Sequence, residues 1–421
     1  MDTMDDKLGG AFKIIYELLQ VNDLDVLLER ALTEIRNIIG TDAGSIYLVE
    51  GRLLKFSCTQ NRTLQKRLPF GKKLTYSRLG VPIGSKSIAG YVAKSGILTN
   101  IADAHNIGEG QPYSFDGSFD QQTGYHSQSV LTAPIMTSNG QIMGVIQLIN
   151  AMDTNDKIKP FTPRDETVVQ LFANNAAVAI SHAQLMSSVI LRMHRMVQWH
   201  DPTETVGHMN RLTAYAAEIY EAWARKKGVV SKEEQYNRDV LRMAAMFYNI
   251  GKIALPSHVL GRRETLSKEE LELRKKHTIY GAQIFNDASS DFEKMAMDIA
   301  LNHHEHWDGS GFPGYIDIAT GMPLAGYARD DGTAFGKRGE EIPIAARIVA
   351  LADTYDTLLY GFDELNREIL PNDTTIRSAL DAITSCSGTK FDPEVVEAFA
   401  SSLETINSIV DDYNKAVTAG M

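Results

Sequence analysis

The chain has 421 residues, of which 43% are hydrophobic and 23% charged, which predicts a globular protein of two or three domains. Its formal net charge of −11, with no basic run to offset it, argues against nonspecific nucleic-acid binding. Two cysteines, Cys58 and Cys386, are too few for a disulfide framework. We recognise no signal-peptide core and no apolar run long enough to span a membrane. We therefore expect a cytoplasmic protein without a membrane partner.

The first half of the chain begins with a helical pattern and then changes to a strand pattern. Residues 10–39 carry apolar side chains at helical spacing. Further on, Glu50-Gly51 and Asn139-Gly140 each separate two β-rich runs, which predicts two hairpins. We therefore expect a sheet with flanking helices.

Two histidines lie in a stretch rich in Gly, Ser and Asp. His105 and His126 both fall within residues 103–127, and no metal cluster stands out in this half of the sequence. We interpret the stretch as a pocket lid or a surface loop rather than a catalytic site.

Residues 163–199 keep a helical pattern almost without interruption. A helix of this length usually pairs with another element. We expect residues 164–199 to connect two domains and to form the seam of a homodimer. A single helix packed into a core is the alternative.

The first half resembles the GAF domain over about residues 10–183. The resemblance rests on Ser87-Ile-Ala-Gly-Tyr-Val and on Gly144-Val-Ile-Gln-Leu-Ile-Asn. It implies a small-ligand pocket in a domain spanning residues 1–183. Asn150, Phe161, Asp165 and Glu166 match the motif of GAF domains that bind cyclic nucleotides. The basic residue of that motif is replaced by Ala151. A cyclic nucleotide is the implied ligand, with another small ligand, or none, as the alternative.

The second half reads almost entirely as helix, so the expected fold class is α+β. Apolar spacing predicts helices at 206–227, 234–248, 267–286, 291–304, 342–361, 373–385 and 392–416. Ser267 begins a capping box.

Histidines and acids recur at ordered positions along these helices. Glu204 and His208 are four residues apart and are expected on one helical face. His303 and His304 are adjacent, so on a helix their side chains diverge by about 100° and suit two neighbouring metals better than one. Imidazole and carboxylate ligands suit iron, manganese or zinc. Taken singly, each histidine is more often a surface or core residue than a ligand.

The second half closely resembles the HD-GYP domain over about residues 190–415, and we assign residues 200–421 to this domain. The resemblance rests on His277-Thr-Ile-Tyr-Gly, on the run from Asn302 to Pro313, and on the run from Ile342 to Asp353. Members of this family are metal-dependent phosphodiesterases that hydrolyse cyclic dinucleotides, above all cyclic di-GMP. The metal ligands implied by position are Glu204, His208, His277, His303, His304 and Asp353. Lys252 matches a lysine that faces the substrate phosphate, and the signature loop corresponds to Gly311, Phe312 and Pro313.

One departure from the family changes the expected chemistry. The His-Asp pair that names the family should precede Ile250-Gly-Lys, but Tyr248 and Asn249 occupy these positions. The resemblance implies that the missing aspartate bridges two metals. An asparagine carbonyl cannot supply that charge, and a tyrosine with a pKa of about 10 is a poor ligand near neutrality.

Two functions remain open from the sequence. We expect a signalling protein in which a GAF sensor regulates a degenerate HD-GYP domain, with cyclic di-GMP hydrolysis lost or reduced and a binding or docking role retained. The alternative is an active phosphodiesterase with a non-standard metal site. The expected cofactor is a divalent metal, partial or absent, with iron or manganese favoured over zinc. A cyclic dinucleotide and a signalling protein are the expected partners.

Overall fold

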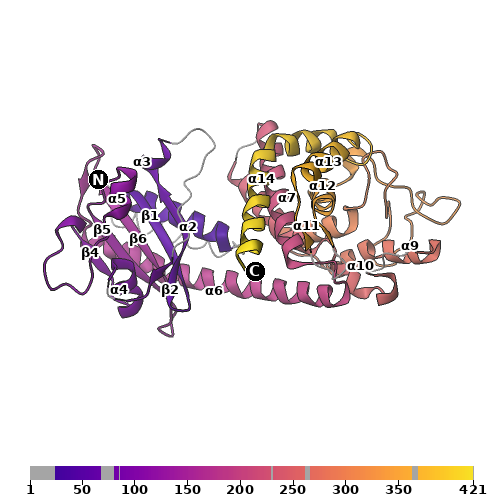
Figure 1. Ribbon diagram of the computed structural model, residues 1–421. Helices are drawn as coiled ribbons and strands as arrows, with labels where there is room; N and C mark the ends of the chain where they lie inside the picture. The colour runs from indigo at the N-terminus through magenta and orange to yellow at the C-terminus, as the bar shows by residue number, and fades with distance from the viewer. Residues whose placement is uncertain are drawn as a thin grey trace. The chain divides into compact units, whose positions relative to one another are not determined.

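The computed structural model describes residues 24–67, 80–84, 86–228, 231–260, 266–362 and 368–420 (Figure 1). The chain divides into two compact units, residues 1–188 and residues 189–421. The first part of the helix predicted over residues 10–39 lies outside the described residues, and its second part forms α2 (Leu24–Ile39).

The first unit is built on an antiparallel sheet in the order β3-β2-β1-β6-β5-β4, with β7 paired to β6 (Figure 1). Both predicted hairpins are confirmed, because Glu50 pairs with Leu53 and β5 runs into β6 across Gly140. The strands are β1 (Thr41–Glu50), β2 (Leu53–Asn61), β3 (Val81–Pro82), β4 (Thr99–Ile101), β5 (Val130–Met136), β6 (Ile142–Met152) and β7 (Ile158–Lys159).

The two faces of this sheet have different partners. Side chains of β1, β5 and β6 on one face form a core with α2 and with the first half of α6 (Pro163–His200). The other face carries α4 (Ile88–Ser95), which Ser87 caps and Gly96 ends in a left-handed conformation. The short helices α3 (Arg62–Gln65) and α5 (Ser118–Thr123) complete the unit. Alternating side chains thus separate a packed face from a face that can hold a ligand.

The helix α6 confirms the long helix predicted from residue 163 and has 38 residues. Several of its large apolar side chains are exposed, among them Leu185 (59%) and Trp199 (81%). An 18-residue window of α6 reaches a mean hydropathy of 1.2 with no more than two charged residues. That composition is weak support for a membrane span, since core helices of soluble proteins also reach it.

The second unit is a helical assembly around one apolar core. Its central helix, α7 (Val206–Lys226), packs against α8, α12 and α14. The other helices are α8 (Lys232–Ala244), α9 (Lys268–Lys275), α10 (His277–Gln283), α11 (Asp291–Asn302), α12 (Ile344–Leu359), α13 (Asp373–Ser385) and α14 (Pro393–Gly420). Short 3-10 turns at 245–247, 250–254, 257–259 and 339–341 and a two-stranded pair, β8 (Gly361–Phe362) with β9 (Glu368–Ile369), complete the fold. The α+β class is confirmed.

Two predicted helices and one predicted pairing of side chains differ from the structure in ways that matter for the site. The helix predicted over 267–286 has its Ser267 capping box but divides into α9 and α10. The helix predicted over 234–248 ends at Ala244, so Tyr248 and Asn249 lie beyond it in 3-10 turns. The helix α7 begins after Thr205, whose side chain accepts a hydrogen bond from the His208 amide, so Glu204 lies in the preceding turn. The prediction that Glu204 and His208 share a helical face is therefore wrong.

Candidate functional site

The predicted site residues of the second unit gather into two adjoining groups. One is a closed polar network around Glu204 and His208. The other is a cluster of three imidazoles, which we call the histidine trio and define as His277, His303 and His304. The rings of His303 and Tyr248 lie 5.3 Å apart, centroid to centroid, and join the two groups.

Both carboxylate oxygens of Glu204 have protein partners. Its Oε1 accepts from Lys252 Nζ at 2.5 Å and from Asn249 Nδ2 at 2.8 Å, and its Oε2 accepts from the Tyr248 hydroxyl at 3.3 Å. The Lys252 ammonium also donates to Asp201 Oδ2 at 3.1 Å. Burial alone would lower the pKa of Lys252, but the charges of Glu204 and Asp201 raise it. Lys252 is therefore held as a buried cation between two carboxylates.

His208 is enclosed in the same way. Its Nδ1 donates to Asp356 Oδ2 at 2.6 Å, and its Nε2 lies 2.7 Å from the Tyr248 hydroxyl and 3.2 Å from Asp353 Oδ1. Burial alone would lower the pKa of His208, but hydrogen bonds to Asp353 and Asp356 and their charges raise it to about 10. Both ring nitrogens of His208 thus have protein partners, and the neighbouring carboxylates favour its protonated form.

Behind His208 lies a fully buried ion pair. Arg211 is 2% exposed, and its Nε and one terminal nitrogen donate to the two oxygens of Asp356, each at 2.8 Å. The guanidinium carbon also lies 3.5 Å from the centre of the Tyr360 ring and 4.3 Å from that of Tyr413. This bidentate pair fixes the carboxylate that orients His208.

The charges of the network nearly balance without any further cation. Four carboxylates, those of Asp201, Glu204, Asp353 and Asp356, face three cationic side chains, those of Lys252, His208 and Arg211. Burial alone would raise the pKa of Asp353, but its hydrogen bond with His208 and the neighbouring positive charges lower it. Asn249 Oδ1 is buried without a hydrogen-bond partner among the described residues.

The histidine trio has the opposite character. His277 Nδ1 donates to the Arg274 carbonyl at 2.7 Å, and His303 Nδ1 lies 3.0 Å from the Ile299 carbonyl. Both Nε2 atoms are buried and lack a hydrogen-bond partner among the described residues. A backbone carbonyl at Nδ1 leaves the lone pair on Nε2, which is how metal-binding histidines are commonly oriented.

The three imidazoles converge on one point. One ligand nitrogen from each lies within 4.8 Å of the others. Burial, with the charge of His303, lowers the pKa of His277 to about 3, and burial lowers the pKa of His304 well below its usual value. Clustered imidazoles with lowered pKa values, two of which have a buried Nε2 with no hydrogen-bond partner among the described residues, fit a divalent transition metal. His303 is the C-cap of α11 and His304 lies beyond the helix, so the two imidazoles approach each other instead of diverging as they would within a helix.

The signature loop packs directly against the trio. The Phe312 ring stacks on His304 with centroids 4.8 Å apart, and the bond from Phe312 to Pro313 is cis. A Cβ atom at Gly311 would lie 2.3 Å from the His306 amide nitrogen, so a side chain cannot be accommodated there. The signature loop thus packs along one side of the histidine trio.

A buried carboxylate ties this loop to the segment that follows it. Glu305 is 3% exposed and accepts hydrogen bonds from the backbone amides of Gly314 and Lys337. Burial raises the pKa of Glu305. Both ends of segment 314–337 are therefore anchored at one side chain.

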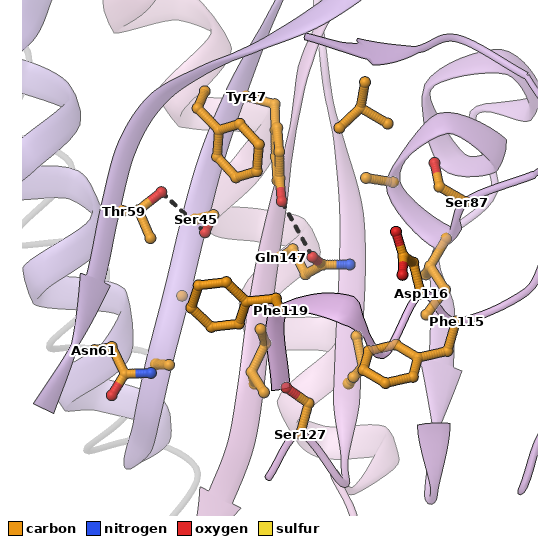
Figure 2. A pocket seen from close by; sticks show the side chains of 18 of the residues that line it. Ser45, Tyr47, Thr59, Asn61, Ser87, Phe115, Asp116, Phe119, Ser127 and Gln147 are labelled. Carbon is orange, nitrogen blue, oxygen red and sulfur yellow. Dashed lines mark hydrogen bonds between the residues drawn. The ribbon is translucent and has the colours of Figure 1, made fainter. Parts of the chain in front are cut away.

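The first unit holds a separate cavity of about 230 Å³ on the face of the sheet that carries α4 (Figure 2). Aromatic side chains line it, with Tyr47, Phe115 and Phe119 around the space seen in Figure 2. The Tyr47 hydroxyl is 3.4 Å from Gln147 Oε1. Among the described residues, the lining contains two carboxylates, Asp116 and Asp120, and no lysine or arginine.

The four residues of the predicted GAF ligand motif do not line this cavity. The Asn150 side chain bonds the Gln128 amide and the His126 carbonyl, at 2.8 and 2.7 Å, and so holds the preceding loop. Phe161 lies in the core on the other face of the sheet, Asp165 accepts from the Thr162 amide, and Glu166 accepts from Asn100. These residues support the domain rather than contact a ligand in the cavity.

Sequence reasoning did not single out Asp201, Arg211 or Asp356 as partners of the predicted ligands. Asp356 stands in the motif that contains Asp353, three residues further on, which is the spacing of neighbours on a helix. Arg211 has the same spacing from His208. No sequence signal connects Asp201 to Lys252, because the contact joins segments 51 residues apart.

Comparison with known proteins finds a different domain family in each of the two units. Residues 23–180 match the GAF domain family and residues 203–320 match the HD domain family. The chain is 30% identical over 226 residues to a cyclic di-GMP phosphodiesterase of Thermotoga maritima, covering 54% of this chain and 51% of that protein. It is 26% identical over 271 residues to the cyclic di-GMP phosphodiesterase response regulator RpfG of Xanthomonas campestris, covering 62% and 64% respectively.

A third relative has a different named activity. The chain is 34% identical over 176 residues to the dual 3',5'-cyclic-AMP and -GMP phosphodiesterase 11A of Takifugu rubripes, covering 40% of this chain and 18% of that protein. In each of these three comparisons the match spans less than two thirds of the relative's length. The chain therefore contains a GAF domain followed by an HD domain, and the proteins that it resembles include two named cyclic di-GMP phosphodiesterases.

Proposed function

We propose that this chain is a signalling protein whose HD domain holds one metal ion at the histidine trio and has lost most or all hydrolysis of cyclic di-GMP. The observation that carries the proposal is the closure of Glu204 and His208. Lys252, Asn249 and Tyr248 occupy the polar atoms of Glu204, and Asp356 and Tyr248 occupy those of His208. Two of the six family ligand positions are thereby committed to protein partners.

The trio would hold the ion through His277, His303 and His304, with Asp353 nearby to supply charge. Such an ion would supply Lewis-acid polarisation of a phosphoryl oxygen. Lys252 would contribute little to substrate binding, because its ammonium already bonds Glu204 and Asp201. With Glu204, His208 and Lys252 committed to protein partners, cleavage of a cyclic dinucleotide is disfavoured, and we propose a binding or docking role for the domain instead.

The test is metal content and turnover on the full chain. The difference in bound iron, manganese or zinc between the natural chain and the His277→Ala/His304→Ala variant should be one equivalent. Cyclic di-GMP should show little or no hydrolysis in either protein. A difference of two equivalents, or turnover that the His277→Ala/His304→Ala change abolishes, would contradict the proposal.

An active phosphodiesterase with a non-standard metal site is the second candidate. The observation that favours it is the pair of buried Nε2 atoms on His277 and His303, which have no hydrogen-bond partner in the part of the chain that the structure describes. A single ion there can still polarise a phosphoester. Turnover that depends on the histidine trio is the result that would select this candidate.

We further propose a homodimer paired along α6. Seven exposed residues of this helix follow the alternating spacing of four and three that defines a coiled-coil seam: Val178, His182, Leu185, Val189, Arg192, Met196 and Trp199. Five of the seven are apolar, and Leu185 is 59% exposed. An exposed apolar seam of this kind is covered when two copies pair.

The variant Leu185→Glu/Val189→Glu should convert the full chain from dimer to monomer at micromolar concentration. Two like charges would then face their copies across the seam. Light scattering measures the mass directly. The matched control, Gln184→Glu, adds an exposed charge beside the seam and should leave the dimer intact. A natural chain that is monomeric at micromolar concentration would rule the dimer out.

For the cavity of the GAF domain we propose a small ligand with a planar ring, with a cyclic mononucleotide as the first candidate. Aromatic rings on several sides suit stacking, and Gln147 and Asn61 offer amide groups that can pair with a base edge. Calorimetry with cyclic AMP and cyclic GMP on the full chain should show binding that Phe119→Ala weakens at least about tenfold, as loss of one stacking partner does. Phe335→Ala, an exposed ring of the other domain, should have no effect. Absence of heat at millimolar ligand would exclude both nucleotides.

A further inference from the structure

A second group of metal-ligating side chains lies in the GAF domain. His105 from the 3-10 turn Ala104–Asn106, Asp120 from α5, and His126 from the loop before β5 each offer a ligand atom within 4.8 Å of the others. The two imidazole rings stack with centroids 5.0 Å apart and planes 11° from parallel. No local sequence pattern predicts a metal cluster here, because His105 and His126 are 21 positions apart.

The distance between the first two ligands suits a shared ion. His105 Nε2 lies 3.2 Å from Asp120 Oδ2. Zinc binds histidine nitrogen at about 2.0–2.1 Å and carboxylate oxygen at about 2.0–2.2 Å, so two tetrahedral ligands are about 3.3–3.5 Å apart. An ion can therefore bind both atoms with little movement of either side chain, and only His126 has to approach.

The carboxylate of this group is held in place by its surroundings. Asp120 is 7% exposed, and its Oδ2 and Oδ1 accept from the amide and hydroxyl of Ser127 at 2.7 and 2.8 Å. The His126 backbone is fixed by Asn150, whose Nδ2 donates to the His126 carbonyl at 2.7 Å. Such supporting contacts orient ligands and raise metal affinity.

We propose that His105, Asp120 and His126 form a binding site for a divalent transition-metal ion at the wall of the GAF cavity. Two imidazoles and one carboxylate on one side of an ion leave coordination positions open on the other side. Asp120 and Ser127 line the cavity, and Figure 2 shows Ser127 at its edge. The open positions can therefore accept a donor atom from a molecule bound in the cavity. This site is separate from the histidine trio and does not depend on the proposed function of the HD domain.

The test is calorimetric titration of the chelator-treated full chain with zinc chloride. To remove the histidine trio, the background variant is His277→Ala/His304→Ala, and we expect it to retain one zinc equivalent. Adding His105→Gln and His126→Gln should abolish that equivalent, with a loss of affinity beyond the about 10–100-fold typical of removing a supporting contact. Glutamine can still donate to Asp120, so the loop keeps its hydrogen bond while losing its imidazole ligands.

The matched control replaces an exposed histidine outside the cluster. Adding His258→Gln to the same background should leave the zinc equivalent in place. Circular dichroism of each variant shows that the fold is retained. If the background variant binds no zinc tighter than millimolar, or if the two glutamine substitutions leave binding unchanged, the contact of His105 with Asp120 is a hydrogen bond of the loop and the proposal is wrong.

Discussion

The double substitution Tyr248→His/Asn249→Asp is expected to raise the metal content of the HD domain from one ion to two. Histidine restores an imidazole, and aspartate restores a charged oxygen beside Glu204, which Asn249 now contacts through its amide nitrogen at 2.8 Å. The phenol is a poor substitute, because burial and the charges of Asp353 and Glu204 raise the pKa of Tyr248 well above its usual value. The added carboxylate also competes with Glu204 for the Lys252 ammonium, which frees an oxygen of Glu204.

Hydrolysis of cyclic di-GMP should appear in this variant but remain weak. A hydroxide shared by two metals about 3.5–4 Å apart is a far stronger nucleophile than water on one metal. Positioning is not restored to the same extent, because Lys252 keeps Asp201 as a partner, and loose positioning alone can cost about a hundredfold.

Metal analysis and product chromatography on the two single variants and on a control pair separate the contributions of Tyr248 and Asn249. The single variant Asn249→Asp should gain part of the second ion, and Tyr248→His should gain less, since the bridging charge comes from the aspartate. The control pair Tyr236→His/Asn286→Asp makes the same chemical changes outside the network and should change neither quantity. Equal metal content and equal turnover in the natural chain and the double variant would falsify the inactive assignment.

The second large effect is on stability. Asp356→Ala should lower the free energy of unfolding of the HD domain by about 3–5 kcal/mol, because it leaves the Arg211 guanidinium buried without its carboxylate. His208 loses a partner in the same step. Urea unfolding can be followed by tryptophan fluorescence, since Trp199, Trp223 and Trp307 all lie in the second unit.

Two further variants establish that the effect comes from a buried Arg211 charge that has lost its carboxylate. Arg211→Met/Asp356→Leu replaces the whole pair by apolar side chains and should recover much of the loss. Glu394→Ala removes one partner of the exposed pair with Lys227 and should cost at most about 1 kcal/mol. A loss at Asp356→Ala no larger than that at Glu394→Ala would show that the buried pair contributes little.

Local sequence patterns predicted most of the fold because the signals that they use are themselves local. The turn residues at Gly51 and Gly140, and the cap at Ser267, act within a few residues of their position. The helix α7 begins at Val206, as predicted, but Thr205 caps it and leaves Glu204 in the turn before the helix, so the predicted pairing of Glu204 with His208 on one helical face was wrong.

The motifs named residues that the structure brings close together, but they did not predict which of these residues contact one another. Motifs identified the histidine trio, whereas the separation of Glu204 and His208 from it depends on contacts with Lys252 and Asp356 that lie 48 and 148 residues away. Such long-range pairs decide whether a carboxylate can bind a metal or is already hydrogen-bonded to other side chains. The predicted dimer, the GAF ligand and the metal count remain predictions.

The anchoring of Glu305 makes segment 314–337 a natural place to enlarge the protein. Since the amides of Gly314 and Lys337 both bond one buried carboxylate, the chain between them closes on itself. Two isolated bridges, Ile316 with Pro323 and Ala328 with Ala334, subdivide it, and Gly332 turns its exposed tip with a φ of +80°. The entropy of loop closure grows only slowly with length, by about 0.6 kcal/mol for each doubling. An epitope or a small fluorescent reporter inserted at residues 330–332 would therefore be carried without changing the distance between the two anchors.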